Sequence, residues 1–288
     1  MGGIRGAFAV LAALSACSIQ QRIPRPVASG EAAGLRAPPD SEIPAGALGV
    51  SIRRGRALLR DTRDSLPDHV GSDLRCFSCH LGEGAQVNAI PFSGVYSRFP
   101  EFRPRNGRVN LLEDRINDCF ERSLNGKALP LESPEMRDLV AYLSFVSRGV
   151  APPGVLPGMR LRALEPLPSD TLRGREVFAE VCARCHGADG AGTALAPPVW
   201  GPRSFNIGAG LARLRSAAAF IRDNMPNDRA VTLTDQQAFD VAGYVLSRPR
   251  PDFAGKENDW PDGAPPDVSY PTKSALKKQA APPKPPTQ

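Results

Sequence analysis

The sequence predicts an all-α protein that is built from two tandem domains of the same kind. The pattern C-x-x-C-H occurs twice, at Cys76–His80 and at Cys182–His186, and the two copies begin 106 residues apart. A helical segment with apolar residues on one face stands before each copy, and a second such segment follows it. A Pro-rich stretch divides the two units. We therefore expect domain 1 at residues 46–150, a linker at 151–168 and domain 2 at 169–262.

The composition excludes two broad classes of protein. With 288 residues, of which 41% are hydrophobic and 23% are charged, the chain is too apolar for wholesale disorder and too polar for many membrane spans. A formal net charge of +6 suits a protein that handles small anions or an acidic partner, and we expect no nucleic-acid partner. Any metal or haem chemistry must be assigned from six cysteines and three histidines.

The N-terminus has the layout of a secretory signal. One positive charge precedes an apolar run over residues 7–14, and small residues then lead to Cys17. The segment Leu14–Cys17 resembles the bacterial lipobox, in which the signal (residues 1–16) is removed and the cysteine is acylated. We therefore expect a lipid-anchored protein on the periplasmic side of a bacterial membrane, and Ser18 favours the outer membrane. The alternative is an ordinary cleaved signal peptide.

Two segments outside the domains have few apolar residues to bury. Residues 17–45 are rich in Pro, Gly and Ala without apolar periodicity, which is typical of a flexible tether. Residues 263–288 carry Pro and Lys and are expected to form a disordered tail. Just before this tail, Asp259–Pro261 could anchor the chain on domain 2. Contact with the membrane is then expected through the lipid alone.

The repeated C-x-x-C-H motif is the attachment signature of c-type haem. Its two thiols add to the vinyl groups of a haem, and the adjoining histidine coordinates the iron. A shared zinc site would need the two cysteine pairs much closer in sequence, and a thioredoxin-like motif would not explain a histidine after both pairs. We therefore expect two covalent haems. Haem 1 would be held by Cys76, Cys79 and His80, and haem 2 by Cys182, Cys185 and His186.

The helical segments that flank the motifs repeat as well. Gly55 and Gly174 begin similar segments before the motifs, and Tyr142 and Tyr244 lie in similar segments after them. A glycine would let the first helix approach the second closely beside the tyrosine. This pairing resembles the contact between the terminal helices of class I cytochromes c. It implies two such domains, each with one covalently bound haem.

Each haem iron needs a further axial ligand, for which electron carriers usually use Met or His. In domain 2, Met225 lies 39 residues after His186 in a loop before a helix, where a class I cytochrome presents its axial methionine; the alternative is a methionine that fills the core. The same count from His80 reaches Cys119, so we expect the first iron to be bound by His80 and by Cys119 as its thiolate. Two alternatives remain for domain 1: Cys119 is an inert buried thiol, or Met136 is the ligand.

The residues around Cys119 closely resemble the dihaem thiosulfate dehydrogenases. The segment Arg115–Gly126 matches R-I-N-x-C-F-E-R-S-x-N-G, and domain 2 adds matching blocks at Ala196–Pro202 and Ser204–Gly210. The resemblance extends over residues 50–262. It implies an enzyme that oxidises two thiosulfates to tetrathionate, in some members reversibly, and that passes two electrons to a small cytochrome or a similar redox protein.

The resemblance also implies roles for single residues. Cys119 is the expected ligand of haem 1 and the catalytic sulfur, Arg105 and Arg115 are expected to bind the substrate, and Ser123 lies nearby. Guanidinium groups bind sulfonate oxygens as they bind carboxylates or phosphates. For Arg98 and Arg122 we expect local salt bridges instead.

One position departs from a pattern found in the family. Some members have a lysine immediately before the axial methionine of haem 2 and can exchange the two ligands. Here that residue is Asn224, so we expect no such exchange.

Three other functions compete with this interpretation. A dihaem electron carrier would share the fold but would need no thiol at position 119. A haem subunit of a thiosulfate-carrier oxidation complex would work with a partner haem protein. A dihaem peroxidase is disfavoured because no histidine is free to act as a removable ligand.

Overall fold

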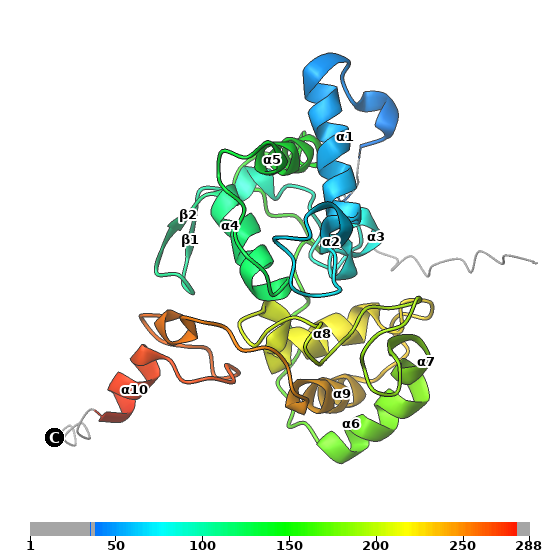
Figure 1. The fold of residues 1–288 in the computed structure, drawn as a ribbon. Helices are drawn as coiled ribbons and strands as arrows, with labels where there is room; N and C mark the ends of the chain where they lie inside the picture. Colours follow the sequence, from blue (N-terminus) through cyan, green and yellow to red (C-terminus); the bar gives the residue numbers. More distant parts are fainter. Residues whose placement is uncertain (1–34, 36–37, 281–288) are drawn as a thin grey trace, which may run out of the picture.

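The computed structural model describes residue 35 and residues 38–280, and within this part the protein is almost entirely helical (Figure 1). The regular β-structure among these residues is one antiparallel hairpin of β1 (Glu101–Arg103) and β2 (Arg108–Asn110), in which Phe102 pairs with Val109. The predicted all-α class is confirmed. No helix in the described part is long and apolar enough to span a membrane. The expected signal peptide and Cys17 lie outside the described residues.

Domain 1 is organised around two crossing helices, α1 and α5. Helix α5 begins where Ser133 accepts a hydrogen bond from Met136 N and where Pro134 occupies its first turn. The core between the helices includes Ile52 and Leu139, which are 2% and 1% exposed. The helices are α1 (Gly46–Arg60), α2 (Thr62–Ser65), α3 (Leu81–Gly84), α4 (Leu112–Asp118) and α5 (Pro134–Val146), and a π-helical turn (Cys119–Ser123) continues α4.

Domain 2 repeats this plan with α6 and α9 in the crossing positions. Asp170 caps α6 by accepting from Leu172 N and Arg173 N, and a capping box of Thr234 and Gln237 opens α9. Residues 151–168 between the domains contain no helix or strand. The helices are α6 (Thr171–Val177), α7 (Ala183–His186), α8 (Leu214–Asn224) and α9 (Asp235–Ser247), with a π-helical turn (Phe178–Cys182) between α6 and α7.

The predicted glycine crossing is present in both domains. A Cβ atom added to Gly55 would lie 1.9 Å from the carbonyl oxygen of Asp138, and one added to Gly174 would lie 2.0 Å from that of Asp240. Each would also meet the Cβ of a tyrosine, Tyr142 or Tyr244, at 2.9 Å. Only glycine permits backbones to come this close. The internal duplication therefore extends from the sequence to the packing of the helices.

The C-terminal segment differs from the disordered tail that the sequence predicts. The chain continues beyond α9 through residues 248–280 to a last helix, α10 (Lys273–Ala280). Tyr270 and Thr272 are 8% and 0% exposed, and the Tyr270 hydroxyl donates to the carboxylate of Asp259 at 2.6 Å. Although the segment is rich in Pro and Lys, a few buried residues, such as Tyr270 and Thr272, hold it against the rest of the protein. The Asp259–Pro261 anchor also contacts domain 1, since Trp260 N donates to the carbonyl of Arg105 at 2.8 Å.

Candidate active site

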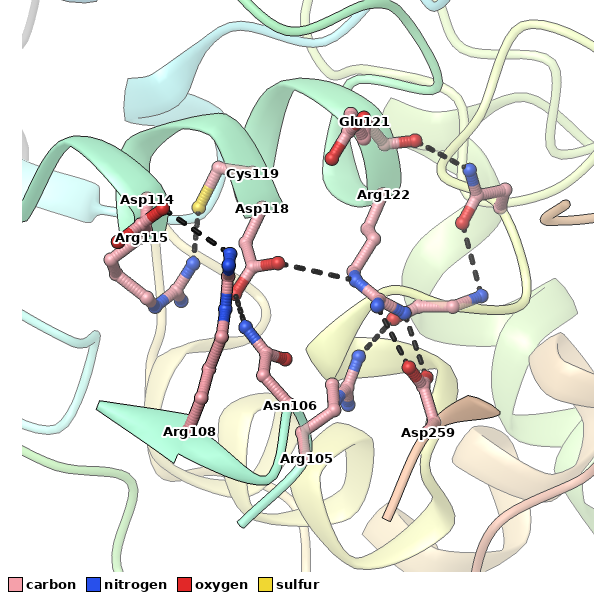
Figure 2. A network of polar contacts seen from close by, with 12 residues as sticks. Arg105, Asn106, Arg108, Asp114, Arg115, Asp118, Cys119, Glu121, Arg122 and Asp259 are labelled. Carbon is pink, nitrogen blue, oxygen red and sulfur yellow. Dashed lines mark hydrogen bonds and ion pairs between the residues drawn. The ribbon is translucent and has the colours of Figure 1, made fainter. Parts of the chain in front are cut away.

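Cys119 is the first residue of the π-helical turn that ends α4, and Arg115 lies one helical turn before it (Figure 2). The Nη1 atom of Arg115 donates to the Sγ atom of Cys119 at 2.8 Å, as the i, i+4 spacing allows. The negative charge of a Cys119 thiolate raises the pKa of Arg115 above its ordinary value, despite the opposing effect of burial. The sequence therefore places a permanent positive charge against this sulfur. Single π-turns of this kind are frequent at functional sites.

Domain 2 holds this turn in place. The side-chain amide of Asn206 donates to the carbonyl oxygen of Glu121 at 2.8 Å and to Asn125 Oδ1 at 3.1 Å. Its Oδ1 atom accepts from Gly208 N at 3.0 Å. Asn206 is 2% exposed, so these bonds are made away from water. The turn that carries Cys119 is thus positioned by both domains.

The first C-x-x-C-H motif has the donor set that a c-type haem requires. Burial, together with the smaller effect of the charge of Cys119, raises the pKa of the Cys76 and Cys79 thiols to about 12. The Nδ1 atom of His80 lies 2.5 Å from the carbonyl oxygen of Ile90. Because a carbonyl only accepts hydrogen bonds, Nδ1 carries the proton and Nε2 is left free to bind a metal. Burial also lowers the pKa of His80 to about 4, which keeps the imidazole neutral.

The second motif repeats this arrangement. The Nδ1 atom of His186 lies 2.8 Å from the carbonyl oxygen of Pro197, and burial lowers the pKa of His186. A cavity of about 710 Å³ is lined by Cys182, Cys185, His186 and Met225, so both predicted axial residues of haem 2 face one space. Ser78 and Cys79 of the first motif line the same cavity. Both attachment motifs therefore border a single cavity, and their residues fit the cofactor.

Met136, the alternative axial residue of domain 1, stands in the first turn of α5. It is 1% exposed and belongs to the apolar core cluster against which Cys76 and Cys79 also pack. Ser123 closes the π-helical turn that Cys119 opens and is half-buried. The structure thus places Arg115, Cys119 and Ser123 on one continuous stretch of helix.

The arginines around Cys119 form two groups. Among the residues that the structure describes, Arg105 and Arg115 have no carboxylate partner within 4.0 Å. The salt bridges expected for Arg98 and Arg122 are confirmed, although Arg122 is buried rather than solvated. Arg105 and Arg115 therefore keep a charge that an anion could use. The ion pairs of the other arginines here are Arg98–Glu101 at 2.8 Å, Arg103–Glu101 at 3.1 Å, Arg108–Asp114 at 3.3 Å and Arg122–Asp259 at 2.8 Å.

Arg105 lies in the turn between β1 and β2, and its side chain does not point at Cys119. Figure 2 shows it directed toward the Arg122–Asp259 pair, on the same side of α4 as Arg115. Its Nη1 atom donates to the carbonyl oxygen of Gly208 in domain 2, and its guanidinium carbon lies 4.5 Å from the centre of the Trp260 ring. Burial, followed by the charge of Arg122, lowers the pKa of Arg105 to about 10.

Sequence reasoning did not single out Arg103, a further arginine near Arg115. Burial, followed by the charge of Arg115, lowers the pKa of Arg103. Glu101 accepts from both Arg98 and Arg103 and offsets their charge. The four arginines and one glutamate between Arg98 and Arg108 indicated an excess of positive charge in this segment. The structure adds that Glu101 pairs with Arg98 and Arg103.

Asn224, the residue before Met225, ties the two domains together. It is fully buried, and its Oδ1 atom accepts from Gln86 Nε2 at 2.7 Å. Its Nδ2 atom donates to the carbonyl oxygens of Asn88 at 3.1 Å and Phe220 at 3.0 Å. The bonds to Gln86 and Asn88 reach the loop that also carries the Ile90 carbonyl. This environment accounts for an amide at a position where some family members have lysine.

Replacing Asn224 by alanine should lower the free energy of unfolding by about 1–3 kcal/mol, because buried hydrogen-bonding groups lose their partners. Urea unfolding followed by far-UV circular dichroism measures this change. Asn227 is exposed and lies three residues after Asn224, so it provides the control. Its replacement by alanine should change the free energy of unfolding by no more than about 0.5 kcal/mol. Equal free energies of unfolding for Asn224→Ala and the wild type would show that these hydrogen bonds make no net contribution to stability.

Comparisons with known proteins give the two domains separate matches. The model described as "SoxA/TsdA, cytochrome c domain" matches residues 70–151, and that described as "Cytochrome C oxidase, cbb3-type, subunit III" matches residues 169–245. The chain thus contains two cytochrome c domains in tandem, the class of domain that binds haem covalently.

Whole proteins of known activity match most of the chain. A thiosulfate dehydrogenase of Allochromatium vinosum is 47% identical over 78% of this chain and 87% of its own length, and one of Psychrobacter arcticus is 43% identical over 81% and 74%. The solved thiosulfate dehydrogenase TsdBA of Marichromatium purpuratum superposes with a TM-score of 0.74 at 35% identity, over 76% of this chain and half of that longer chain. With two cytochrome c domains and thiosulfate dehydrogenases as relatives over most of its length, the chain belongs to the thiosulfate dehydrogenase family.

Proposed function

We propose that this enzyme joins two thiosulfate ions through their sulfane sulfurs to form tetrathionate, with release of two electrons, and that it can also run in reverse. The observation that carries the proposal is the 2.8 Å contact between Arg115 Nη1 and Cys119 Sγ. A guanidinium in this position donates a hydrogen bond to the sulfur and attracts a dianion to the same place. Membership of the family supplies the substrate.

The cofactors in this proposal are two c-type haems. The first would be held covalently by Cys76 and Cys79, and His80 and Cys119 would bind its iron. The second would be held covalently by Cys182 and Cys185, and His186 and Met225 would bind its iron. The neutral histidines, each with Nδ1 bonded to a carbonyl oxygen, support this assignment. When bound, each haem supplies a one-electron acceptor, so that two haems store the electron pair of one turnover.

The sulfur chemistry in this proposal belongs to Cys119. Its thiolate sulfur forms a bond to the sulfane sulfur of the first thiosulfate, and the two electrons released in this oxidation pass to the cofactors. The second thiosulfate attacks the bound sulfane sulfur, the bond to Cys119 breaks, and tetrathionate leaves. The thiolate is thereby regenerated, and no proton is taken up or released.

The arginines bring the anions together in this scheme. Arg115 contacts the reacting sulfur and balances the charge of the first thiosulfate. Arg105 binds the sulfonate end of a substrate, and the hydroxyl group of Ser123 donates a further hydrogen bond. Guanidinium groups held away from water bind anions more strongly than solvated ones, which favours the approach of two dianions.

Thiosulfate-dependent reduction of ferricyanide by the purified holoprotein without its lipid anchor tests the proposal. We expect one tetrathionate for every two ferricyanide ions reduced, as the stoichiometry of the reaction requires. Tetrathionate-dependent oxidation of the reduced protein tests the reverse direction. A holoprotein that forms no product in either direction would instead act as an electron carrier or as a subunit that needs a partner haem protein.

We propose further that the enzyme is anchored by Cys17 on the periplasmic side of the membrane and delivers its electrons there to a small cytochrome or similar redox protein. The lipobox-like segment Leu14–Cys17 supports the anchor. In a bacterium that processes lipoproteins, radiolabelled palmitate should enter the wild-type chain but not the Cys17→Ala variant. Label that persists in the variant would contradict a lipid at this cysteine. Cys119→Ala serves as the matched control and should be labelled normally.

A further inference from the structure

The segment from Asp259 to Ser274, which we name the strap, lies against the turn that carries Arg105. It follows α9, so it belongs to neither of the two repeated domain plans. Its carbonyl at Trp260 accepts from the hydroxyl of Ser274 at 2.6 Å, which closes the strap on itself. Figure 2 shows its first residue, Asp259, beside Arg105 and Arg122 of domain 1.

A buried ion pair fastens the strap to domain 1. The carboxylate of Asp259 accepts two hydrogen bonds from Arg122, both at 2.8 Å, and a third from the hydroxyl of Tyr270 at 2.6 Å. The side chains of Arg122 and Asp259 are 11% and 5% exposed. A bidentate pair in this environment fixes both position and orientation. The strap is therefore fixed to the helix that carries Cys119.

Trp260 is the part of the strap that meets Arg105. Its ring centre lies 4.5 Å from the guanidinium carbon of Arg105, and its backbone N–H donates to the Arg105 carbonyl at 2.8 Å. Pro261 packs so closely on the same turn that a Cβ atom added to Gly107 would lie 2.5 Å from its Cγ. Trp260 has a backbone φ of +51°, a left-handed conformation that is unfavourable for an aromatic residue. Such strain persists where surrounding contacts impose it, often at functional sites.

These contacts leave the charge of Arg105 unneutralised. The partners of its guanidinium group are the Trp260 ring face and the carbonyl oxygen of Gly208, which carry no net charge. Asp259, the nearby carboxylate, is already bonded to Arg122 and Tyr270. An aromatic face holds a guanidinium group in one plane and leaves its edge able to bind an oxyanion.

We propose that Trp260 is a positioning residue for substrate binding: the strap holds the Arg105 guanidinium in the orientation that receives a thiosulfate sulfonate. The inference rests on the proposed function, because it takes Arg105 as a substrate-binding residue. It adds a segment outside the two haem-binding domains to the substrate site. Trp260 acts on affinity rather than on the sulfur chemistry, since its ring and its backbone N–H contact Arg105, with Arg213 also near the ring, and none of these contacts is to Cys119.

Full-length holoprotein variants at Trp260 test the proposal through steady-state kinetics. Trp260→Ala should raise the KM for thiosulfate about tenfold, the effect of losing a desolvated cation–π contact, and should change kcat by less than about twofold. Trp260→Phe should restore most of the affinity and keep KM within about threefold of the wild type, because phenylalanine gives a weaker cation–π contact. Ser269→Ala, at an exposed strap position away from Arg105, is the control.

Hydrogen–deuterium exchange gives a readout that needs no turnover. In Trp260→Ala the amides of residues 101–110 should exchange faster, whereas those of α6 and α9 should not change. Faster exchange with an unchanged KM, or a lower kcat at unchanged KM, would overturn the proposal. If Trp260→Ala fails to fold, Trp260→Leu takes its place, because leucine keeps an apolar side chain but removes the aromatic face. A KM for thiosulfate in Trp260→Leu equal to that of the wild type would then overturn the proposal. A wild-type protein that turns over no thiosulfate would contradict the proposed function itself, and unchanged exchange in Trp260→Ala would separately contradict the positioning.

Discussion

Replacing Cys119 by alanine should abolish tetrathionate formation and lower kcat by at least about 10³-fold, since the reacting sulfur is lost. The covalent haems should both remain, because their attachment depends on Cys76, Cys79, Cys182 and Cys185. Tetrathionate and reduced ferricyanide would be measured together on the purified variant, with the pyridine haemochrome spectrum giving the haem content. The expected result is a protein with two haems and no turnover.

A matched variant at Met136 separates this assignment from its alternative. Met136→Leu conserves volume in the core of domain 1 and should cost less than about 1.5 kcal/mol of stability. If Cys119 is the ligand, this variant should keep the activity and the electron paramagnetic resonance spectrum of the wild type. The assignment fails if Met136→Leu changes the spectrum while Cys119→Ala does not, or if Cys119→Ala retains full activity.

The second large effect is expected from alanine at Gly174. A Cβ atom there would lie 2.0 Å from the carbonyl oxygen of Asp240, so α6 and α9 would have to move apart. Overpacking of this severity should cost about 3 kcal/mol. For a domain of this size such a loss lowers the midpoint of thermal unfolding by roughly 12 °C or more. Thermal unfolding of the holoprotein, followed by circular dichroism, measures the shift.

Gly210→Ala is the matched control in the same domain. A Cβ atom at Gly210 meets nothing within 4 Å, and the residue is exposed. This substitution should therefore change the midpoint little. Similar midpoints for the Gly174→Ala and Gly210→Ala variants would mean that α6 and α9 do not cross at Gly174 in solution.

The parts of this protein that the sequence predicts well are those with a local physical cause. The C-x-x-C-H motif needs its thiols and histidine within one turn, and the crossing of paired helices needs a glycine opposite a tyrosine. Each requirement produces a short pattern of residues in the sequence, and each pattern occurs twice in the chain. The link between Arg115 and Cys119 is also local, because residues four apart lie on one face of a helix.

The parts that sequence reasoning missed join distant segments. Arg105 and Gly208 stand 103 residues apart, and Arg122 and Asp259 stand 137 apart, so no spacing rule connects them. The composition of the C-terminal segment suggested disorder, because Pro and Lys outnumber the few residues that dock it. The buried rings of Tyr270 and Trp260 determine where the segment lies. Two aromatic residues change the average hydrophobicity of the whole segment very little, so its composition did not reveal them.

The hydrogen bonds of the two motif histidines bear on how one protein could acquire the two different redox centres proposed for it. His80 and His186 are oriented in the same way, each by a backbone carbonyl oxygen ten or eleven residues further on. A bond to the main chain does not depend on which side chain occupies the accepting position, so it survives mutation after a gene is copied. We therefore expect the proposed centres to differ in one further ligand, Cys119 in domain 1 and Met225 in domain 2, and this difference would distinguish a reactive centre from an electron relay.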